Sequence, residues 1–212
     1  MLHGYLSSKE SFVHQINYFS KYFKVVVPDM AGFNGVPMPY PYSLADYARD
    51  IKLLIDKEDG KVDVIAHSFG ARVLFKLLPD DKIDKIVLTG AAGIRPKFSI
   101  KKCVAVARYK LRKRLGLDTA KFGSADYRSL DPVMRASFVK IVNERLEQNI
   151  KSVKNRCLIV FGEKDSETPP YMAKKLKIYI RGSELVFIKG AGHFAFIDKP
   201  FEFNLIIKEF LL

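Results

Sequence analysis

A run of β-branched apolar residues passes through a serine into a helical pattern in Val62-Asp63-Val64-Ile65-Ala66-His67-Ser68-Phe69-Gly70-Ala71-Arg72-Val73-Leu74. The pattern predicts a strand, a tight turn at Ser68 and a helix. A serine in such a turn adopts a strained backbone, for which its neighbours must be small. The turn points the hydroxyl at the free N–H groups of the first helical turn, where negative charge is stabilised. A nucleophilic serine is displayed in this way.

The motif alone does not separate a nucleophile from a serine that caps a helix. In the pattern G-x-S-x-G, Ala66 replaces the first glycine, and serine is also an ordinary N-cap residue. The rest of the chain decides between these readings. A serine hydroxyl becomes nucleophilic only when a base removes its proton and a carboxylate orients that base.

The best candidate base is His193, one of four histidines. It follows the apolar run 185–188 in Gly190-Ala191-Gly192-His193, whose glycines let a loop carry the ring into a cleft. His67 is adjacent to Ser68 and is expected to point away from it, and His14 falls in an expected helix.

The candidate carboxylate is Asp165. It follows the apolar run 157–161 in Gly162-Glu163-Lys164-Asp165, at the carboxyl end of an expected strand. Glu163 competes for this role, but its position in the loop fits less well. The three candidates come in the order Ser, Asp, His, each just past a strand, as in a hydrolase that uses a strand-to-helix serine.

The chain resembles members of the α/β-hydrolase superfamily over nearly its whole length. The resemblance includes the turn around Ser68, the G-x-x-D at 162–165 and the G-x-G-H at 190–193. It also includes Leu2-His3-Gly4-Tyr5, similar to the oxyanion loop, residues 27–33, similar to the turn after the next strand, and residues 124–135, similar to the cap of small bacterial esterases. The resemblance implies that Ser68 is the nucleophile, His193 the general base and acid, and Asp165 its orienter. The backbone N–H groups of Tyr5 and Phe69 would be the oxyanion donors.

Apolar strand-like runs alternate with helical patterns, which predicts an α/β fold: a mostly parallel sheet with helices on both faces. Ligands of such sheets bind beyond the carboxyl ends of the strands, where all three candidate residues fall. Expected strands are 24–27, 62–66, 85–89, 157–161 and 184–188, and expected helices are 8–19, 43–56, 71–77, 170–179 and 200–211.

The alternation stops between residues 94 and 152, which predicts a helical cap inserted into a core formed by residues 1–93 and 153–212. Residues 100–117 have one apolar helical face and an opposite basic face. The basic face is either simply solvated or attracts an anionic partner, such as a carboxylate-bearing substrate or a membrane surface.

Composition predicts one well-buried core, because 48% of the 212 residues are hydrophobic. The net charge of +13 comes with no nucleic-acid-binding motif, so we expect no nucleic-acid partner. Cys103 and Cys157 are interpreted as apolar fillers. The sequence has no cluster of metal-ligating residues, no apolar run of transmembrane length and no secretory signal. It predicts a cytoplasmic protein without metal or other cofactor and leaves the oligomeric state open.

In the family that the chain resembles, the segment His3-Gly4 follows a strand in the middle of the sheet, preceded by one or two edge strands. Only Met1 and Leu2 stand before it here. The hypothesis is that Met1 is not the natural start, because a missing central strand leaves backbone groups unpaired on both neighbours. The alternatives are an impaired short form, strand exchange between chains, or direct pairing of the two flanking strands.

The predicted function is a serine hydrolase that cleaves an ester, thioester or related acyl substrate through an acyl-enzyme. One alternative is a non-catalytic or impaired ligand-binding homologue. Another is a carbon–carbon bond hydrolase, since these enzymes use the same three residues. The serine disfavours dehalogenase and epoxide hydrolase chemistry, which uses an aspartate nucleophile in this family. Acyl-chain preference depends on how the cap packs over the cleft, and no sequence pattern indicates this packing.

Overall fold

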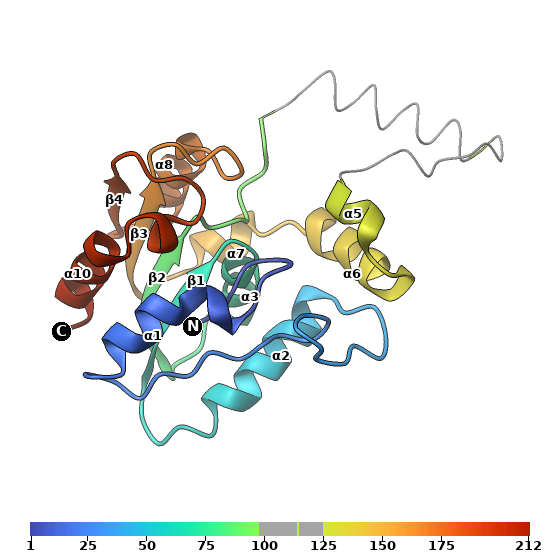
Figure 1. The fold of residues 1–212 in the computed structure, drawn as a ribbon, viewed down its shortest axis with the longest axis horizontal. Coiled ribbons are helices and arrows are strands. Elements are labelled where there is room, and N and C mark those ends of the chain that lie inside the picture. The colour runs from blue at the N-terminus through green and yellow to red at the C-terminus, as the bar shows by residue number, and fades with distance from the viewer. Residues whose placement is uncertain (98–113, 115–124) are drawn as a thin grey trace.

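The computed structural model describes residues 1–97, 114 and 125–212, and in them one parallel sheet forms the centre (Figure 1). Its strand order is β1 (Val62–His67), β2 (Ile83–Thr89), β3 (Arg156–Gly162) and β4 (Glu184–Ile188). The first part of the chain contains the 3₁₀ helix η1 (Lys9–Phe12), α1 (Val13–Phe19), α2 (Leu44–Ile55) and α3 (Phe69–Leu77). The later part contains α5 (Ala125–Ser129), α6 (Pro132–Asn143), α7 (Glu147–Lys151), α8 (Pro170–Tyr179), α9 (Ala195–Asp198) and α10 (Pro200–Leu211).

Helices cover both faces of the sheet. Successive side chains of a strand point to opposite faces, so neighbouring residues belong to different cores. Val64 and Ala66 of β1 belong to one apolar core, which α2, α3 and α8 cover. Ile65, between them, belongs to a second core, which α1 and α10 cover. This arrangement explains why the strands read as unbroken apolar runs, and it confirms the predicted α/β fold.

The carboxyl ends of the parallel strands meet at one edge of the sheet. β1 ends one residue before Ser68, β3 ends three residues before Asp165, and β4 ends five residues before His193. The topology alone therefore brings three residues that are distant in sequence to the same edge.

The prediction of a strand at residues 24–27 was wrong, because this segment has no ladder partner among the described residues. Met1 and Leu2 lie between it and β1. The amino group of Met1 donates to the Val26 carbonyl at 2.6 Å, and Leu2 forms an isolated parallel bridge with Ala66. The flanking segments therefore do not pair directly with each other, in contrast to one alternative above.

A cavity of about 340 Å³ lies beside Met1 and Leu2. The segment 24–26 lines it on one side and residues 62–65 line it on the other. The Leu2 N–H donates to the Ile65 carbonyl at 2.8 Å, so this side of β1 faces Leu2 and the cavity beyond it. The Ile65 N–H points to the same side, because both backbone groups of a strand residue do so, and it has no hydrogen-bond partner in the described parts of the chain. The edge of β1 beyond Leu2 therefore keeps backbone hydrogen-bonding capacity.

The predicted helix at 8–19 is divided into η1 and α1. Ser8 provides no side-chain cap for η1, since its hydroxyl contacts the Glu10 carboxylate instead. The first turn is 3₁₀, and α-helical geometry begins at Val13.

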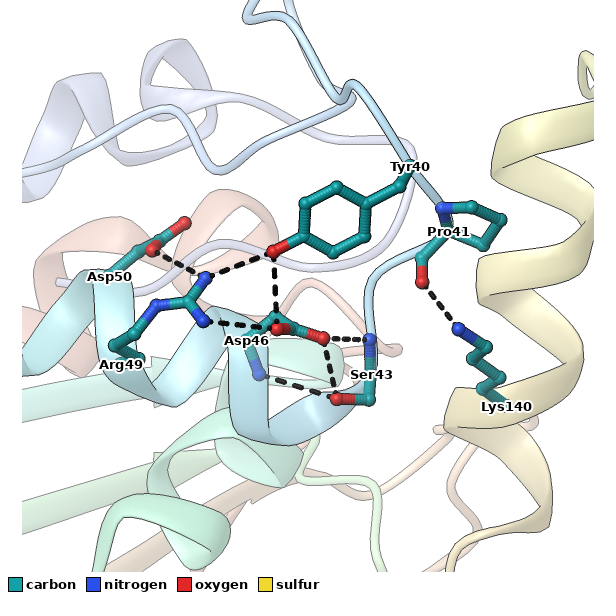
Figure 2. Close-up of polar contacts among 7 residues, drawn as sticks. All are labelled: Tyr40, Pro41, Ser43, Asp46, Arg49, Asp50 and Lys140. Carbon is teal, nitrogen blue, oxygen red and sulfur yellow. Dashed lines mark hydrogen bonds and ion pairs between the residues drawn. The ribbon is translucent and has the colours of Figure 1, made fainter.

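Ser43 is the N-cap residue of α2, and its side chain takes part in a capping box with Asp46 (Figure 2). Ser43 Oγ accepts the Asp46 N–H at 3.4 Å, while the Asp46 carboxylate accepts the Ser43 N–H at 2.8 Å and its hydroxyl at 2.7 Å. The hydroxyl bond first, and then the backbone bond, lower the pKa of Asp46. The charged carboxylate therefore complements the positive end of the α2 dipole.

Helix α6 is attached to the loop just before α2. Lys140 Nζ donates to the Pro41 carbonyl at 2.6 Å (Figure 2), and Ser137 Oγ donates to the Tyr42 carbonyl at 2.8 Å. These bonds fix the helix that carries Phe138, a residue of the pocket described below.

The described part of the predicted cap consists of α5, α6 and α7. The predicted helix at 100–117 lies outside the described residues except for Arg114, as does Cys103. Cys157 is buried in β3, where burial raises the pKa of its thiol to about 12. None of the helices in 1–97 and 125–212 combines the length and apolar character that crossing a bilayer requires.

Candidate active site

Ser68 occupies the tight turn between β1 and α3, with φ of 48° and ψ of −109°. This left-handed conformation is strained for a residue with a side chain. The Ser68 N–H donates to the Thr89 carbonyl at 3.1 Å, and the Ser68 carbonyl accepts the N–H groups of Ala71 and Ala92. Bonds to β2 and to the loop after it therefore hold the serine in a conformation that it would not adopt alone.

Gly70 lets the start of the chain pass directly against this turn. A Cβ added at position 70 would lie 2.5 Å from the Leu2 carbonyl oxygen and 2.7 Å from the Leu2 Cβ. Both distances are far shorter than van der Waals contact. The second glycine of the serine motif is thus required by the approach of Leu2, while the fully buried Ala66 fits in place of the first.

Gly70→Ala is expected to destabilise the protein by about 1–3 kcal/mol, because the backbone of Leu2 must move to admit one methyl group. Gly60→Ala is the matched control, since a Cβ there would meet no atom within 4 Å. Urea unfolding of both variants measures the difference. Equal stability of the two variants would show that Leu2 does not pack against the turn as described.

The two expected oxyanion donors flank Ser68. The N–H groups of Tyr5 and Phe69 have no hydrogen-bond partner among the described residues. The loop that carries Tyr5 is close to the serine, because a Cβ on Gly4 would lie 3.5 Å from Ser68 Cβ. His3 fixes this loop: its Nε2 accepts the Met30 N–H at 3.0 Å, and its Nδ1 lies 2.8 Å from the Gly4 carbonyl. Burial lowers the pKa of His3, which favours the neutral ring that these contacts need.

Asp165 and His193 form a buried pair. The His193 Nδ1 lies 2.9 Å from Asp165 Oδ2. The Thr168 hydroxyl donates to the same oxygen at 2.8 Å, and the N–H groups of Glu167 and Thr168 donate to Oδ1 at 2.9 and 2.8 Å. Burial pushes the pKa of Asp165 upward, but the bonds from His193 and Thr168 outweigh it and leave the pKa below its usual value. The carboxylate therefore stays ionised and can hold the imidazole with its Nδ1 protonated.

Ser68 and His193 open onto one cavity of about 320 Å³. Its lining residues come from the N-terminal loop, the serine turn, the loops after β3 and β4, and the cap: Gly4, Tyr5, Leu6, His67, Ser68, Tyr127, Leu130, Phe138, Glu167, His193 and Phe194. Among the described residues, no hydrogen bond joins the Ser68 hydroxyl to the His193 ring. Instead, His193 Nε2 lies 3.5 Å from the Glu167 carboxylate. Catalytic contacts of this kind are often long before substrate binds.

Two other residues considered from the sequence, Glu163 and His67, make different contacts from those of Asp165 and His193. The Glu163 carboxylate accepts the Gly190 N–H at 3.2 Å, and it is Asp165 that meets the imidazole. His67 is buried with its Nδ1 3.1 Å from the Thr89 carbonyl, and burial, followed by the nearby His193, lowers its pKa to about 3. His67 is thus a neutral ring that packs against His193, with 4.7 Å between the ring centroids.

Sequence reasoning missed Thr168 and Glu167, which contact the Asp165–His193 pair directly. The signal was present: Asp165-Ser166-Glu167-Thr168-Pro169 is typical of a turn in which the Asp side chain accepts later backbone N–H groups. The pocket aromatics Tyr127 and Phe138 had no comparable signal, because their place depends on how the cap folds back over the core.

Comparison with known proteins finds a family and relatives that match nearly the whole chain. The alpha/beta hydrolase family model matches residues 1–204. A 2-hydroxy-6-oxo-2,4-heptadienoate hydrolase of Pseudomonas putida is 22% identical, over 91% of this chain and 79% of its own. A pimeloyl-[acyl-carrier protein] methyl ester esterase of Neisseria meningitidis is 23% identical, over 100% of this chain and 92% of its own. The structure of an esterase from Exiguobacterium antarcticum superposes with a TM-score of 0.78 at 21% identity, covering 99% of this chain and 90% of its own.

Proposed function

Because the chain belongs to the alpha/beta hydrolase family, we propose that it is a serine hydrolase that cleaves a small ester, thioester or related acyl substrate. Ser68 is the nucleophile, His193 the general base and acid, and Asp165 the residue that orients His193. The backbone N–H groups of Tyr5 and Phe69 stabilise the oxyanion.

The reaction proceeds in two halves. Ser68 Oγ attacks the carbonyl carbon while its proton passes to His193 Nε2, and the carbonyl oxygen becomes an oxyanion. The tetrahedral intermediate collapses, the bond to the leaving group breaks, and His193 returns the proton to that group. Water then attacks the acyl-enzyme with His193 again as base, which releases the acid and restores Ser68.

The observation that carries the proposal is the combination of a strained serine and a carboxylate-bound imidazole on one cavity. Asp165 contacts His193 at 2.9 Å, and both His193 and Ser68 line the pocket. A buried Asp–His pair has ordinary structural explanations, and so does a serine before a helix. A serine with φ of 48° beside two N–H groups that have no partner among the described residues points more directly to acyl transfer, which needs donors aimed at the oxyanion.

Relatives of two kinds support hydrolysis, one named as an esterase and one as a hydrolase of a heptadienoate. The described part of the pocket favours an ester over a heptadienoate as the substrate. A heptadienoate carries a carboxylate, whereas the charged side chain nearest His193 Nε2 in the pocket is the Glu167 carboxylate. Carbon–carbon bond hydrolysis is therefore the second candidate.

The proposal predicts hydrolysis of p-nitrophenyl esters by the purified protein, with acetate and butyrate cleaved faster than long acyl chains, because the cavity of about 320 Å³ is small. Release of p-nitrophenolate measures the rate. A folded protein that cleaves none of the series, yet binds short acyl analogues, would establish the non-catalytic alternative.

A further inference from the structure

The pocket has an uneven distribution of charge. Glu167 carries the one carboxylate among the described residues that line it. Its carboxylate lies 3.5 Å from His193 Nε2, the nitrogen that must return the proton to the leaving group. The leaving group of any substrate therefore departs past a negative charge.

Aromatic rings surround the same space. Tyr5 and Phe138 pack edge to face with 5.1 Å between centroids, and Phe138 contacts Tyr127 at 5.7 Å. Phe194 lies 5.3 Å from the His193 ring on another side of the cavity. The Tyr5 hydroxyl donates to the Met134 carbonyl, which helps to keep its ring in place. The Tyr127 ring already carries the Arg135 guanidinium, 5.4 Å from its centroid. Aromatic rings combined with a carboxylate favour cations, quaternary ammonium groups among them, so Tyr5, Phe138 and Phe194 are the rings left for a ligand.

We propose that Glu167 is a specificity-determining residue that selects the substrate by the charge of its leaving group. Esters whose alcohol portion is cationic are preferred over neutral ones, and neutral ones over those that carry a carboxylate. This inference rests on the proposed function, since it assigns the substrate class of the same site.

The contact between Glu167 and His193 also fits the reaction sequence. In the free protein the carboxylate faces Nε2, and its exposed side chain (65% accessible) is free to turn aside when a substrate enters. When Ser68 gives up its proton, Nε2 becomes an N–H donor of an imidazolium ring. A cationic leaving group then lies beside the Glu167 carboxylate. An anionic leaving group is repelled by this carboxylate before His193 returns the proton to it.

The overall charge of +13 acts in the opposite direction, because it attracts anions from a distance. At physiological salt such long-range fields fall off within about 8 Å. A carboxylate in contact range of the leaving group is screened much less. Among the described residues that line the pocket, Glu167 carries the carboxylate nearest His193 Nε2, and it therefore sets the choice between bound substrates.

The test uses three acetate esters that share the acyl group and differ in the alcohol: meta-hydroxyphenyl-trimethylammonium, meta-hydroxybenzamide and meta-hydroxybenzoate. We compare kcat/KM of the wild type with that of Glu167→Gln, which keeps the shape and removes the charge. The preference for the cationic over the anionic ester is expected to fall by about tenfold in the variant. Intrinsic reactivity of the esters cancels in this ratio of ratios.

Glu163→Gln is the matched control, because Glu163 lies in the same loop, contacts Gly190 and does not line the pocket. It is expected to leave the preference unchanged. Active protein in which Glu167→Gln keeps the wild-type preference, or in which Glu163→Gln shifts it equally, overturns the inference alone. A wild type that cleaves none of the three acetates overturns the proposed function and this inference with it.

Discussion

Replacing Ser68 by alanine is expected to lower kcat for a short-chain ester by a factor of about 10⁴ to 10⁶. The variant retains the oxyanion donors and the His193–Asp165 pair but lacks the atom that forms the acyl-enzyme. What remains is the slower attack of a water molecule positioned by the same site. Initial rates of p-nitrophenyl acetate hydrolysis measure the effect.

Ser20→Ala is the control, because Ser20 is exposed at the end of α1 and its hydroxyl makes no hydrogen bond with the described residues. Its kcat is expected to equal that of the wild type. A Ser68→Ala variant that is folded and hydrolyses the ester within tenfold of the wild type would refute a serine nucleophile.

Replacing Asp165 by asparagine is expected to lower kcat by about 10⁴-fold. The asparagine retains an oxygen for the N–H groups of Glu167 and Thr168, but its NH₂ now faces His193 Nδ1. The ring then adopts the tautomer with the proton on Nε2 and cannot accept the proton of Ser68. KM is expected to change little, since Asp165 does not line the pocket.

Glu163→Gln provides the comparison for this prediction as well. Glu163 contacts the N–H of Gly190 and not the imidazole, so its kcat should stay within a few-fold of the wild type. If instead Asp165→Asn retained most of the activity and Glu163→Gln lost it, the carboxylate would have been assigned to the wrong residue.

Much of the fold could be predicted from the sequence, because the strands that are covered on both faces are unbroken apolar runs. β1 to β4 lie where such runs were found, and the turn at Ser68 follows from its small neighbours. The segment 24–27 is also rich in β-branched apolar residues, yet it forms no strand. Whether a β-branched segment becomes a strand depends on a hydrogen-bonded partner, and composition does not show where that partner is.

The candidate site could be predicted in part for a similar reason. Ser68, Asp165 and His193 each follow a strand, and parallel strands bring their carboxyl ends together whatever the details of packing. Glu167 belongs to the same loop as Asp165, but its approach to His193 depends on the backbone path of that loop. Phe138 reaches the pocket because α6 is docked on the loop before α2, through a contact 95 residues apart in sequence, and Tyr127 of α5 packs against its ring.

If His193, held by Asp165, turns one particular hydroxyl into a nucleophile, an active-site label must react at that hydroxyl alone. The protein is incubated with a fluorophosphonate at neutral pH, digested, and the modified peptide is identified by mass spectrometry. We expect one phosphonylated residue, Ser68, with labelling abolished in Ser68→Ala and strongly slowed in Asp165→Asn. Labelling at another residue, or equal labelling of the wild type and Ser68→Ala, would contradict the assignment of Ser68 as the nucleophile.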